Sequence, residues 1–407
     1  MTGPECPAGS GAAPQVRGAA PAGGAFGFRE RLLAPGPVEV PPAVLEAVAR
    51  AVPHHRTAGA RETFLSARSR LAQVFRVPGD DVLIVTGSGT AGFEAALVSS
   101  VPAGGAVLAL QAGKFGERWA GMARRLGYAV EAFAAEPGVE FDLAALAGRL
   151  RALPDLAAVT LVHSETSTGA LHDVQALAAL VRAERPGALV LVDAVTSLAC
   201  AELLPREWGL DAVVSGSQKG VMTPPGLAFV WLSERAWRRA AESAQPRYYL
   251  DLHRERRKQA AGETAYTPAV SLVAGLDVAL GLLLAEGLDA VWRRRAALNA
   301  GLLAAGVALG MRPLAARPSP AVAALLVPDG VSAPDVVKAA RARGAVLAGG
   351  QDEFKPVLIR PSLLGHADRY DAIGVAQLLE DALADVRTGT PRGVAAVAAM
   401  RAMDEVG

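Results

Sequence analysis

The chain of 407 residues has 41 lysine and arginine side chains against 40 aspartates and glutamates, which gives a formal net charge of +1. This balance removes the usual electrostatic argument for a nucleic-acid partner. A hydrophobic fraction of 51% can build large cores, so the composition excludes a wholly disordered chain. No apolar run is long enough to span a bilayer, and we therefore expect no membrane partner.

The cysteine and histidine content bears on disulfide and metal chemistry. The only cysteines are Cys6 and Cys200, which are too few for a disulfide framework or a zinc site, and the histidines show no metal-ligand spacing. We therefore expect no metal. The first 25 residues are rich in glycine, alanine and proline and have no apolar signal segment, so we expect a flexible tail on a cytoplasmic protein.

Short apolar runs alternate with amphipathic segments in the first half of the chain. The runs are residues 82–86, 106–110, 128–133, 158–162, 188–192, 211–215 and 227–231. Runs without polar alternation predict strands buried on both faces of a parallel sheet. The segments 94–99, 116–126, 143–153 and 174–183 have helical periodicity, which predicts an α/β fold whose mostly parallel seven-stranded sheet has helices on both faces. The last run follows Lys219 too closely for a crossover helix, which predicts an antiparallel strand.

The pattern changes after residue 269. Residues 270–310 predict one long helix or two, and shorter runs at 321–327 and 357–359 are accompanied by helical patterns at 333–343 and 368–386. We therefore expect four parts. They are a flexible tail at 1–25, a large domain with an N-terminal arm lying on it at 26–269, a smaller α+β domain at 270–388 and a C-terminal tail at 389–407.

A glycine-rich segment at residues 87–92, Gly-Ser-Gly-Thr-Ala-Gly, follows the first predicted strand. Its spacing is typical of nicotinamide dinucleotide sites, but the next strand ends at Gln111 without the carboxylate that such sites need. The more general prediction is a phosphate site, because a helix N-terminus offers free N–H groups and hydroxyls from Ser88 and Thr90. A tight turn without a ligand is the alternative.

Lys219 and Asp193 each follow a predicted buried strand. A lysine among small residues at such a place loses its proton more easily, which suits an amine that attacks a carbonyl, although a solvated lysine is the alternative. Asp193 and the polar stretch at 163–169 also stand at strand ends, where ligands bind in open α/β sheets, and their alternatives are a turn cap and a solvated loop. Together these features predict an anion cradle, an amine and a carboxylate at one edge of the sheet.

Nine short motifs then occur in order along the chain. They are LAPGP at 33–37, HHR at 54–56, SGT at 88–90, GKFGERW at 113–119, HSETSTG at 163–169, VDAV at 192–195, SGSQK at 215–219, YTPAV at 266–270 and Arg360. In this order they resemble the class V aminotransferases of the pyridoxal-phosphate fold-type I group. The resemblance is to the branch of alanine–glyoxylate, serine–glyoxylate and serine–pyruvate aminotransferases. It runs from residue 33 to about residue 365.

The resemblance implies a role for each matching residue. Lys219 would bind pyridoxal 5′-phosphate covalently, Asp193 would pair with the ring nitrogen and Arg360 would bind the substrate α-carboxylate. The other implied cofactor contacts are Phe115 and Val195 on the ring, Thr166 near its phenolic oxygen, and Ser88, Gly89, Thr90 and Gln218 at the phosphate, joined by Thr267 from the partner subunit of a homodimer. The catalytic residues would then be Lys219 and Asp193.

The implied activity is transfer of an amino group from a small amino acid, alanine or serine, to a 2-oxo acid, glyoxylate or pyruvate. The mechanism would be a ping-pong aldimine/ketimine cycle. Where the family has Arg-Ile-Gly, this chain has Arg360-Pro361-Ser362, which removes a backbone donor beside the arginine.

Several alternatives share parts of this pattern. Phosphoserine transamination is the first, because His54, His55, Arg56 and Arg61 could bind a substrate phosphate, although the same cluster fits a solvated loop or a subunit contact. A cysteine desulfurase would need a reactive cysteine late in the chain, which is absent. A nicotinamide-dependent oxidoreductase and a cofactor-binding regulatory protein without transaminase activity are the others.

Overall fold

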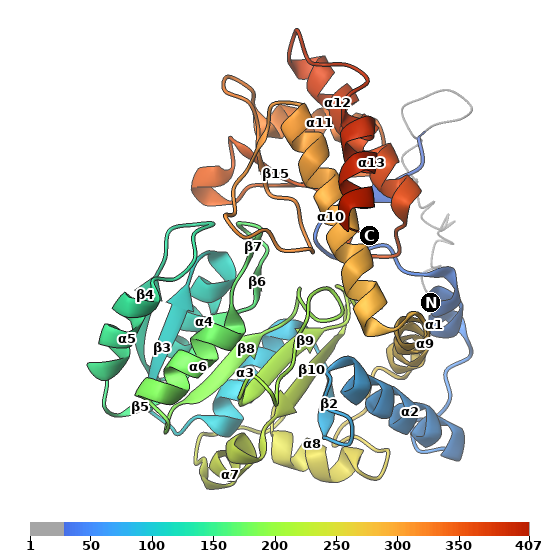
Figure 1. The fold of residues 1–407 in the computed structure, drawn as a ribbon. Helices are drawn as coiled ribbons and strands as arrows, with labels where there is room; N and C mark the ends of the chain where they lie inside the picture. The colour runs from blue at the N-terminus through green and yellow to red at the C-terminus, as the bar shows by residue number, and fades with distance from the viewer. Residues whose placement is uncertain (1–27, 407) are drawn as a thin grey trace, which may run out of the picture.

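The computed structural model describes residues 28–406, so the tail predicted at 1–25 lies outside the described residues (Figure 1). Its centre is a seven-stranded sheet with the order β2-β10-β9-β8-β5-β3-β4. The strands are β2 (Val82–Thr86), β3 (Ala106–Gln111), β4 (Ala129–Ala134), β5 (Leu156–Val162), β8 (Leu189–Asp193), β9 (Ala212–Gly216) and β10 (Leu227–Leu232). All neighbours pair in parallel except β10, which is antiparallel to both β2 and β9. The predicted mostly parallel sheet and its antiparallel strand are confirmed.

Helices cover both faces of this sheet. One face packs against α2 (Ala58–Val74), α5 (Leu143–Arg151), α6 (Val174–Glu184) and α9 (Val270–Glu286), and the other against α3 (Gly89–Ser100), α4 (Lys114–Arg125), α7 (Glu234–Glu242) and α8 (Leu252–Gln259). Successive strand residues alternate between the two cores, as Val190 and Leu191 do in β8. Because both faces are buried, the strands read in the sequence as continuous apolar runs.

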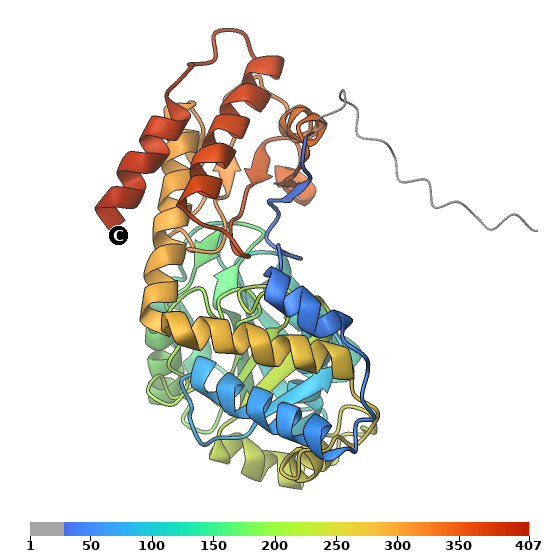
Figure 2. The ribbon, with the colours of Figure 1, turned by 90° about the vertical axis from the view of Figure 1, so that its right-hand side faces the viewer.

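The C-terminal part has a third core. It is built from α10 (Leu288–Ala308), α11 (Ala333–Ala342), α12 (Arg369–Val386) and a small sheet of β11 (Arg312–Pro313), β12 (Leu325–Leu326), β15 (Leu358–Arg360) and β14 (Ala348–Gly349). The segment 270–310, predicted as one long helix or two, forms two helices, α9 and α10, with an angle of 88° between them (Figure 2). The bend falls at Gly287, whose φ of 86° suits glycine. Of the residues that the structure describes, no single helix is long and apolar enough to cross a membrane.

Two terminal segments differ from the sequence-based expectation. In the predicted tail at 389–407, α13 (Ala395–Val406) packs on α10 and α12 and buries Ala395, Ala399 and Met403 at helical spacing. In the N-terminal arm, β1 (Arg31–Leu32) pairs in parallel with β13 (Ala345–Val346) of the C-terminal part, while α1 (Pro42–Ala49) packs on α9. The arm therefore connects both parts instead of lying on the larger one alone. The boundaries of the four predicted parts stay predictions.

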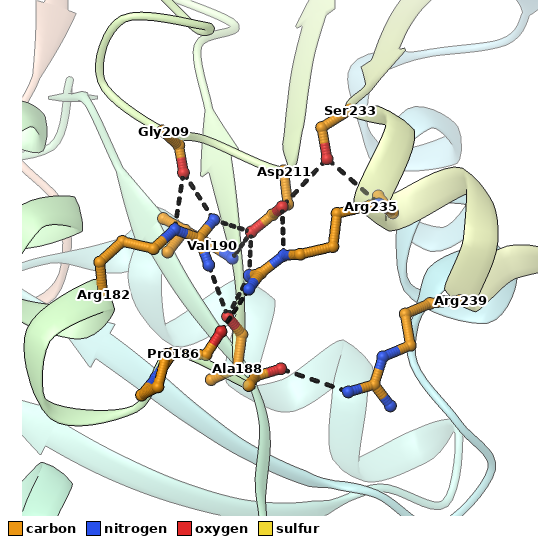
Figure 3. Close-up of polar contacts among 11 residues, drawn as sticks. Arg182, Pro186, Ala188, Val190, Gly209, Asp211, Ser233, Arg235 and Arg239 are labelled. Atoms are coloured by element: carbon orange, nitrogen blue, oxygen red, sulfur yellow. Dashed lines mark hydrogen bonds and ion pairs between the residues drawn. The ribbon is translucent and has the colours of Figure 1, made fainter.

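A network of ion pairs and hydrogen bonds lies at the amino-terminal edge of the sheet (Figure 3). The buried carboxylate of Asp211, just before β9, accepts hydrogen bonds from Val190 N at 2.8 Å and Ser233 Oγ at 3.0 Å. It also pairs with the guanidinium groups of Arg182 from α6 and Arg235 from α7. The network attaches a helix on each face to the sheet.

Candidate active site

The predicted polar residues meet at the opposite, carboxyl-terminal edge of the sheet. β2, β5, β8 and β9 all end at this edge, because β10 is antiparallel to its two neighbours. The residues that follow them are the glycine-rich segment, the hairpin of β6 (Ser164–Glu165) and β7 (Ala170–Leu171), and Lys219 after β9. The sheet therefore brings together residues that are more than a hundred positions apart in the chain.

Asp193, the last residue of β8, is buried and has few partners. Its Oδ1 accepts one hydrogen bond, from Val195 N at 2.8 Å, and within residues 28–406 its Oδ2 accepts none. Burial raises the pKa of Asp193 to about 7, with a contribution from nearby Glu165, although Val195 N and Lys219 oppose the shift. A carboxylate with this much spare capacity can take a further cationic donor.

Lys219 faces the same space. Burial lowers its pKa to about 8, against the opposing effect of Asp193 and together with the positive charges of Arg360 and Arg118. Its Nζ donates a hydrogen bond to the carbonyl of Pro35 in the N-terminal arm. The arm approaches so closely that a Cβ on Gly36 would lie 2.7 Å from Nζ, and the φ of +109° at this position also favours glycine.

The glycine-rich segment forms the start of α3. Ser88 is its N-cap, and the first amide groups of the helix have no intrahelical acceptor. A Cβ on Gly89 would lie 2.8 Å from Val195 Cγ2, so only glycine fits between the helix and the loop after β8. The side-chain oxygen of Gln218 is buried nearby without a hydrogen-bond partner and can only accept a hydrogen bond. The free amide groups at the start of α3 are the donors that are suited to an anion.

Arg360, at the end of β15, reaches the site from the C-terminal part. Its Nε donates to Gly349 O and its Nη1 to Thr166 O, both at 2.8 Å, while Nη2 has no hydrogen bond among the described residues. The proline that follows does not disorder this loop, because Pro361 O accepts from Ala323 N at 3.0 Å and Ser362 N donates to Leu33 O at 2.8 Å. The planar guanidinium is thus oriented with one nitrogen free.

The family relationship agrees with this arrangement. The model of the family "Aminotransferase class-V" matches residues 36–364. The chain belongs to the class-V aminotransferases. Enzymes of this family use pyridoxal phosphate, and this one is a fold-type I transaminase. Family membership leaves the nicotinamide-dependent oxidoreductase without support.

Three relatives illustrate the similarity. A soluble hydrogenase small subunit of Synechococcus sp. (strain PCC 6716) is 37% identical over 379 residues, which is 91% of this chain and 98% of the relative. A serine–glyoxylate aminotransferase of Methylorubrum extorquens is 31% identical over 382 residues, covering 90% and 95%. The crystal structure of an aspartate aminotransferase of Thermus thermophilus superposes with a TM-score of 0.83 at 44% identity, covering 88% of this chain and all of that one.

The residues of this aminotransferase fit pyridoxal phosphate by two independent observations. Asp193 keeps an unused carboxylate oxygen for a protonated ring nitrogen, and the free amide groups at the start of α3 can donate hydrogen bonds to the phosphate. Phe115 lies at the start of α4, where the resemblance places a stacking aromatic ring. The part of the chain that the structure describes contains no group of side chains placed to hold a metal ion.

Thr267, which the resemblance assigns to the site of the partner subunit, lies outside this group, and three residues near Lys219 and Asp193 were missed. Thr267 is exposed before α9 and has no hydrogen bond with the residues around Lys219. Arg118 was missed, although its guanidinium lies 4.8 Å from the centre of the Phe115 ring and its charge acts on Asp193 and Lys219. Pro35 was quoted only within a motif, and so was Glu165. No local sequence pattern predicts that the Pro35 carbonyl accepts a hydrogen bond from Lys219, or that the Glu165 carboxylate binds the start of α4.

Proposed function

We propose that this aminotransferase moves the amino group of alanine or serine to glyoxylate or pyruvate. The observation that carries the proposal is the buried pair of Lys219 and Asp193 beside Arg360, whose charges act on one another. A serine–glyoxylate aminotransferase among the relatives supports the small donor and the 2-oxo acid acceptor. Arg360 supplies one free nitrogen for a carboxylate, which both kinds of substrate carry.

The proposed roles follow from the position of each residue. Ser88, Gly89, Thr90 and Gln218 would bind the cofactor phosphate at the start of α3. Phe115 and Val195 would pack against the cofactor ring, and Thr166 would interact with its phenolic oxygen. Asp193 keeps a proton on the ring nitrogen, because a buried carboxylate with one donor gains from a cationic partner. Pyridoxal phosphate, when bound, supplies an electron sink next to the substrate Cα.

The chain's own residues then bind the substrate and move its proton. The guanidinium of Arg360 binds the α-carboxylate through the in-plane N–H groups of its free Nη2, which orients the substrate in the site. Nζ of Lys219 takes the α-proton as a general base and would deliver it to C4′ of the cofactor. Because burial lowers the pKa of Lys219 to about 8, roughly a tenth of this amine is unprotonated at pH 7.

We also infer a cytoplasmic homodimer in which Thr267 of one protomer completes the phosphate site of its partner. Thr267 is exposed and lines an open groove with residues 52–55 and 268–272. Val52 in this groove is 68% exposed, which is unusual for a large apolar side chain unless another surface covers it. If the inference holds, the native mass is that of two chains, and Thr267→Ala weakens cofactor binding without changing that mass.

The visible absorption spectrum tests the proposal directly. Purified protein loaded with pyridoxal phosphate is expected to show a band of the lysine-bound cofactor, and L-alanine or L-serine is expected to convert it to the pyridoxamine form. Glyoxylate or pyruvate should then restore the band. A band that responds to neither amino acid would contradict the proposed donors, and a protein that binds no cofactor would contradict the assignment of the site.

A further inference from the structure

Glu165 is the most enclosed charged group near the site, and the proposed function assigns it no role. It is fully buried in the β6–β7 hairpin. Its Oε2 accepts hydrogen bonds from Phe115 N at 3.0 Å and Gly116 N at 3.2 Å, and its Oε1 accepts from Ser167 N at 3.1 Å and from Ser167 Oγ. Four donors therefore converge on one carboxylate.

Two of these donors are the second and third amides of α4, while the first, Lys114 N, donates to Ser167 Oγ at 3.1 Å. A carboxylate at a helix N-terminus both satisfies these amides and interacts favourably with the helix dipole. Here the carboxylate comes from another element, so it also fixes the direction in which α4 leaves β3. The contact leaves no spare space, since a Cβ on Gly113 would lie 2.7 Å from the Cγ and Cδ of Glu165. The side chain of Phe115 starts from the backbone that is held in this way.

The same turn also holds Arg360. The carbonyl of Thr166, between the two residues of the Glu165–Ser167 contact, accepts the hydrogen bond of Arg360 Nη1 at 2.8 Å. Burial raises the pKa of Glu165, and its hydrogen bonds from Ser167, Gly116 and Phe115 oppose that shift and favour the carboxylate. This carboxylate adds to the effect of burial in raising the pKa of Asp193, and it opposes the effect of burial in lowering the pKa of Arg360. The Glu165 carboxylate is thus linked to Phe115 by a backbone hydrogen bond, to Arg360 through the neighbouring Thr166 and to Asp193 by its charge.

We propose that Glu165 is a positioning residue that sets the ring of Phe115 and the guanidinium of Arg360 relative to one another. This inference rests on the proposed function, because it takes Phe115 as the ring contact and Arg360 as the carboxylate site. Glu165 itself touches neither substrate nor cofactor. Its charge also stabilises protonated groups in the site, because a nearby negative charge favours the cationic form.

The test compares Glu165→Gln with Glu380→Gln. Glu380 is a matched control, because it is equally buried and accepts hydrogen bonds from three backbone amides, Gly393 N, Val394 N and Ala395 N, at the start of α13. It lies in the C-terminal core, outside the cluster around Lys219. Both glutamine variants place an amide where the protein presents only donors, so both are expected to lose stability.

Only Glu165→Gln is expected to change the site. In the cofactor-free protein, amide hydrogen exchange at residues 114–117 should become about tenfold faster than in the wild type. In the holoenzyme, the pH titration of the cofactor band should move down by about half a pH unit, because a nearby negative charge is lost. The KM for the amino donor should rise about tenfold, a larger change than that in kcat, because Arg360 binds the substrate in the ground state.

Wild-type exchange at residues 114–117 together with an unchanged titration in Glu165→Gln would overturn the proposal. So would equal effects in the two variants, which would show a general loss of stability. If Glu165→Gln does not fold, Glu165→Asp tests the same point, since it keeps the charge but draws it away from α4. For Glu165→Asp, amide exchange at residues 114–117 is expected to be faster than in the wild type, while the pH titration of the cofactor band stays near that of the wild type. Exchange at the wild-type rate in this variant would overturn the proposal. Failure of the wild-type band to respond to any amino donor would count against the proposed function instead, because the exchange measurement needs no cofactor.

Discussion

Each of the two edges of the central sheet contains a buried aspartate, and the two aspartates differ in the number of partners that the chain gives them. At the amino-terminal edge, Asp211 accepts hydrogen bonds from Val190 N and Ser233 Oγ and pairs with two arginines (Figure 3). At the carboxyl-terminal edge, Asp193 on the neighbouring strand β8 accepts one hydrogen bond. A carboxylate with all its partners in the chain stabilises the fold, whereas one with unused capacity is available to a ligand. Within one sheet, Asp211 therefore has the partners of a residue that stabilises the fold, and Asp193 has the free capacity of a residue that binds a ligand.

The largest effect that would test this comparison is the loss of the amine next to Asp193. Lys219→Ala is expected to lower kcat by about 10⁴-fold or more, because it removes both the covalent anchor and the base. The cofactor band of the bound lysine should also be absent. Lys338→Ala is the control, since Lys338 is an exposed lysine of α11. Turnover by Lys219→Ala at more than a few per cent of the wild-type rate would contradict the assignment.

A crossed pair of variants tests the comparison itself. Asp193→Asn keeps the acceptor for Val195 N but loses the charge, so kcat should fall by about 10²–10³-fold with little loss of stability. Asp211→Asn leaves Arg182 and Arg235 with reduced compensation and should cost about 3–5 kcal/mol in the free energy of unfolding while the folded enzyme stays active. Kinetics and urea unfolding of both variants give the answer. Equal losses of activity and stability in the two variants would break the comparison.

The pH dependence of stability in the cofactor-free protein should report on the same groups. The pKa of Asp193 is raised to about 7 in the folded state, so the folded protein holds this proton more tightly, and stability falls as the pH rises from about 4 to about 7. The pKa of Lys219 is lowered to about 8, so the unfolded chain binds more protons between about 8 and 10.5, and stability rises with pH there. The buried His163 and His172, whose pKa values are lowered to about 3 and about 4, change stability in the opposite sense below about pH 6.5, so the two contributions are measured as differences between the wild type and a variant. The stability difference between wild type and Asp193→Asn should decrease as the pH rises from about 4 to about 7, and the difference between wild type and Lys219→Ala should increase from about 8 to about 10.5, each by about 3–4 kcal/mol.

The smallest effect concerns the arm over Lys219. Gly36→Ala places a methyl group 2.7 Å from Lys219 Nζ, which must move the lysine or the arm, and activity should fall about tenfold. Gly79→Ala is matched for its positive φ of +86°, but its Cβ would meet nothing within 4 Å. The control should therefore lose some stability and keep its activity. A Gly36→Ala enzyme with wild-type kcat and KM would show that the arm does not hold the lysine.

Much of the sheet could be predicted because its signals are local. All seven strands were located. Six of them are almost wholly buried and therefore show no polar alternation, while β4 at the edge of the sheet is partly exposed but is still an apolar run that contains one glutamate. The short connection before β10 left no room for a crossover helix. The sequence did not decide between one helix and two over residues 270–310, since the helical periodicity continues through α9 and α10. The pairing of β1 with β13 was not predicted, because two-residue strands carry no periodic signal.

The sequence by itself determined which residues stand at the strand ends: Asp193, Lys219, the glycines before α3 and the polar hairpin after β5. Parallel strands then bring these ends to one edge, so the composition of the site was readable from residue order. Only the tertiary structure decided that the Pro35 carbonyl accepts a hydrogen bond from Lys219, that Glu165 binds the start of α4 and that the Thr166 carbonyl binds Arg360. It also decided that Asp211 has all its partners in the chain while Asp193 does not. Such contacts join residues far apart in the chain, and they depend on side-chain direction and packing, which a one-dimensional pattern does not contain.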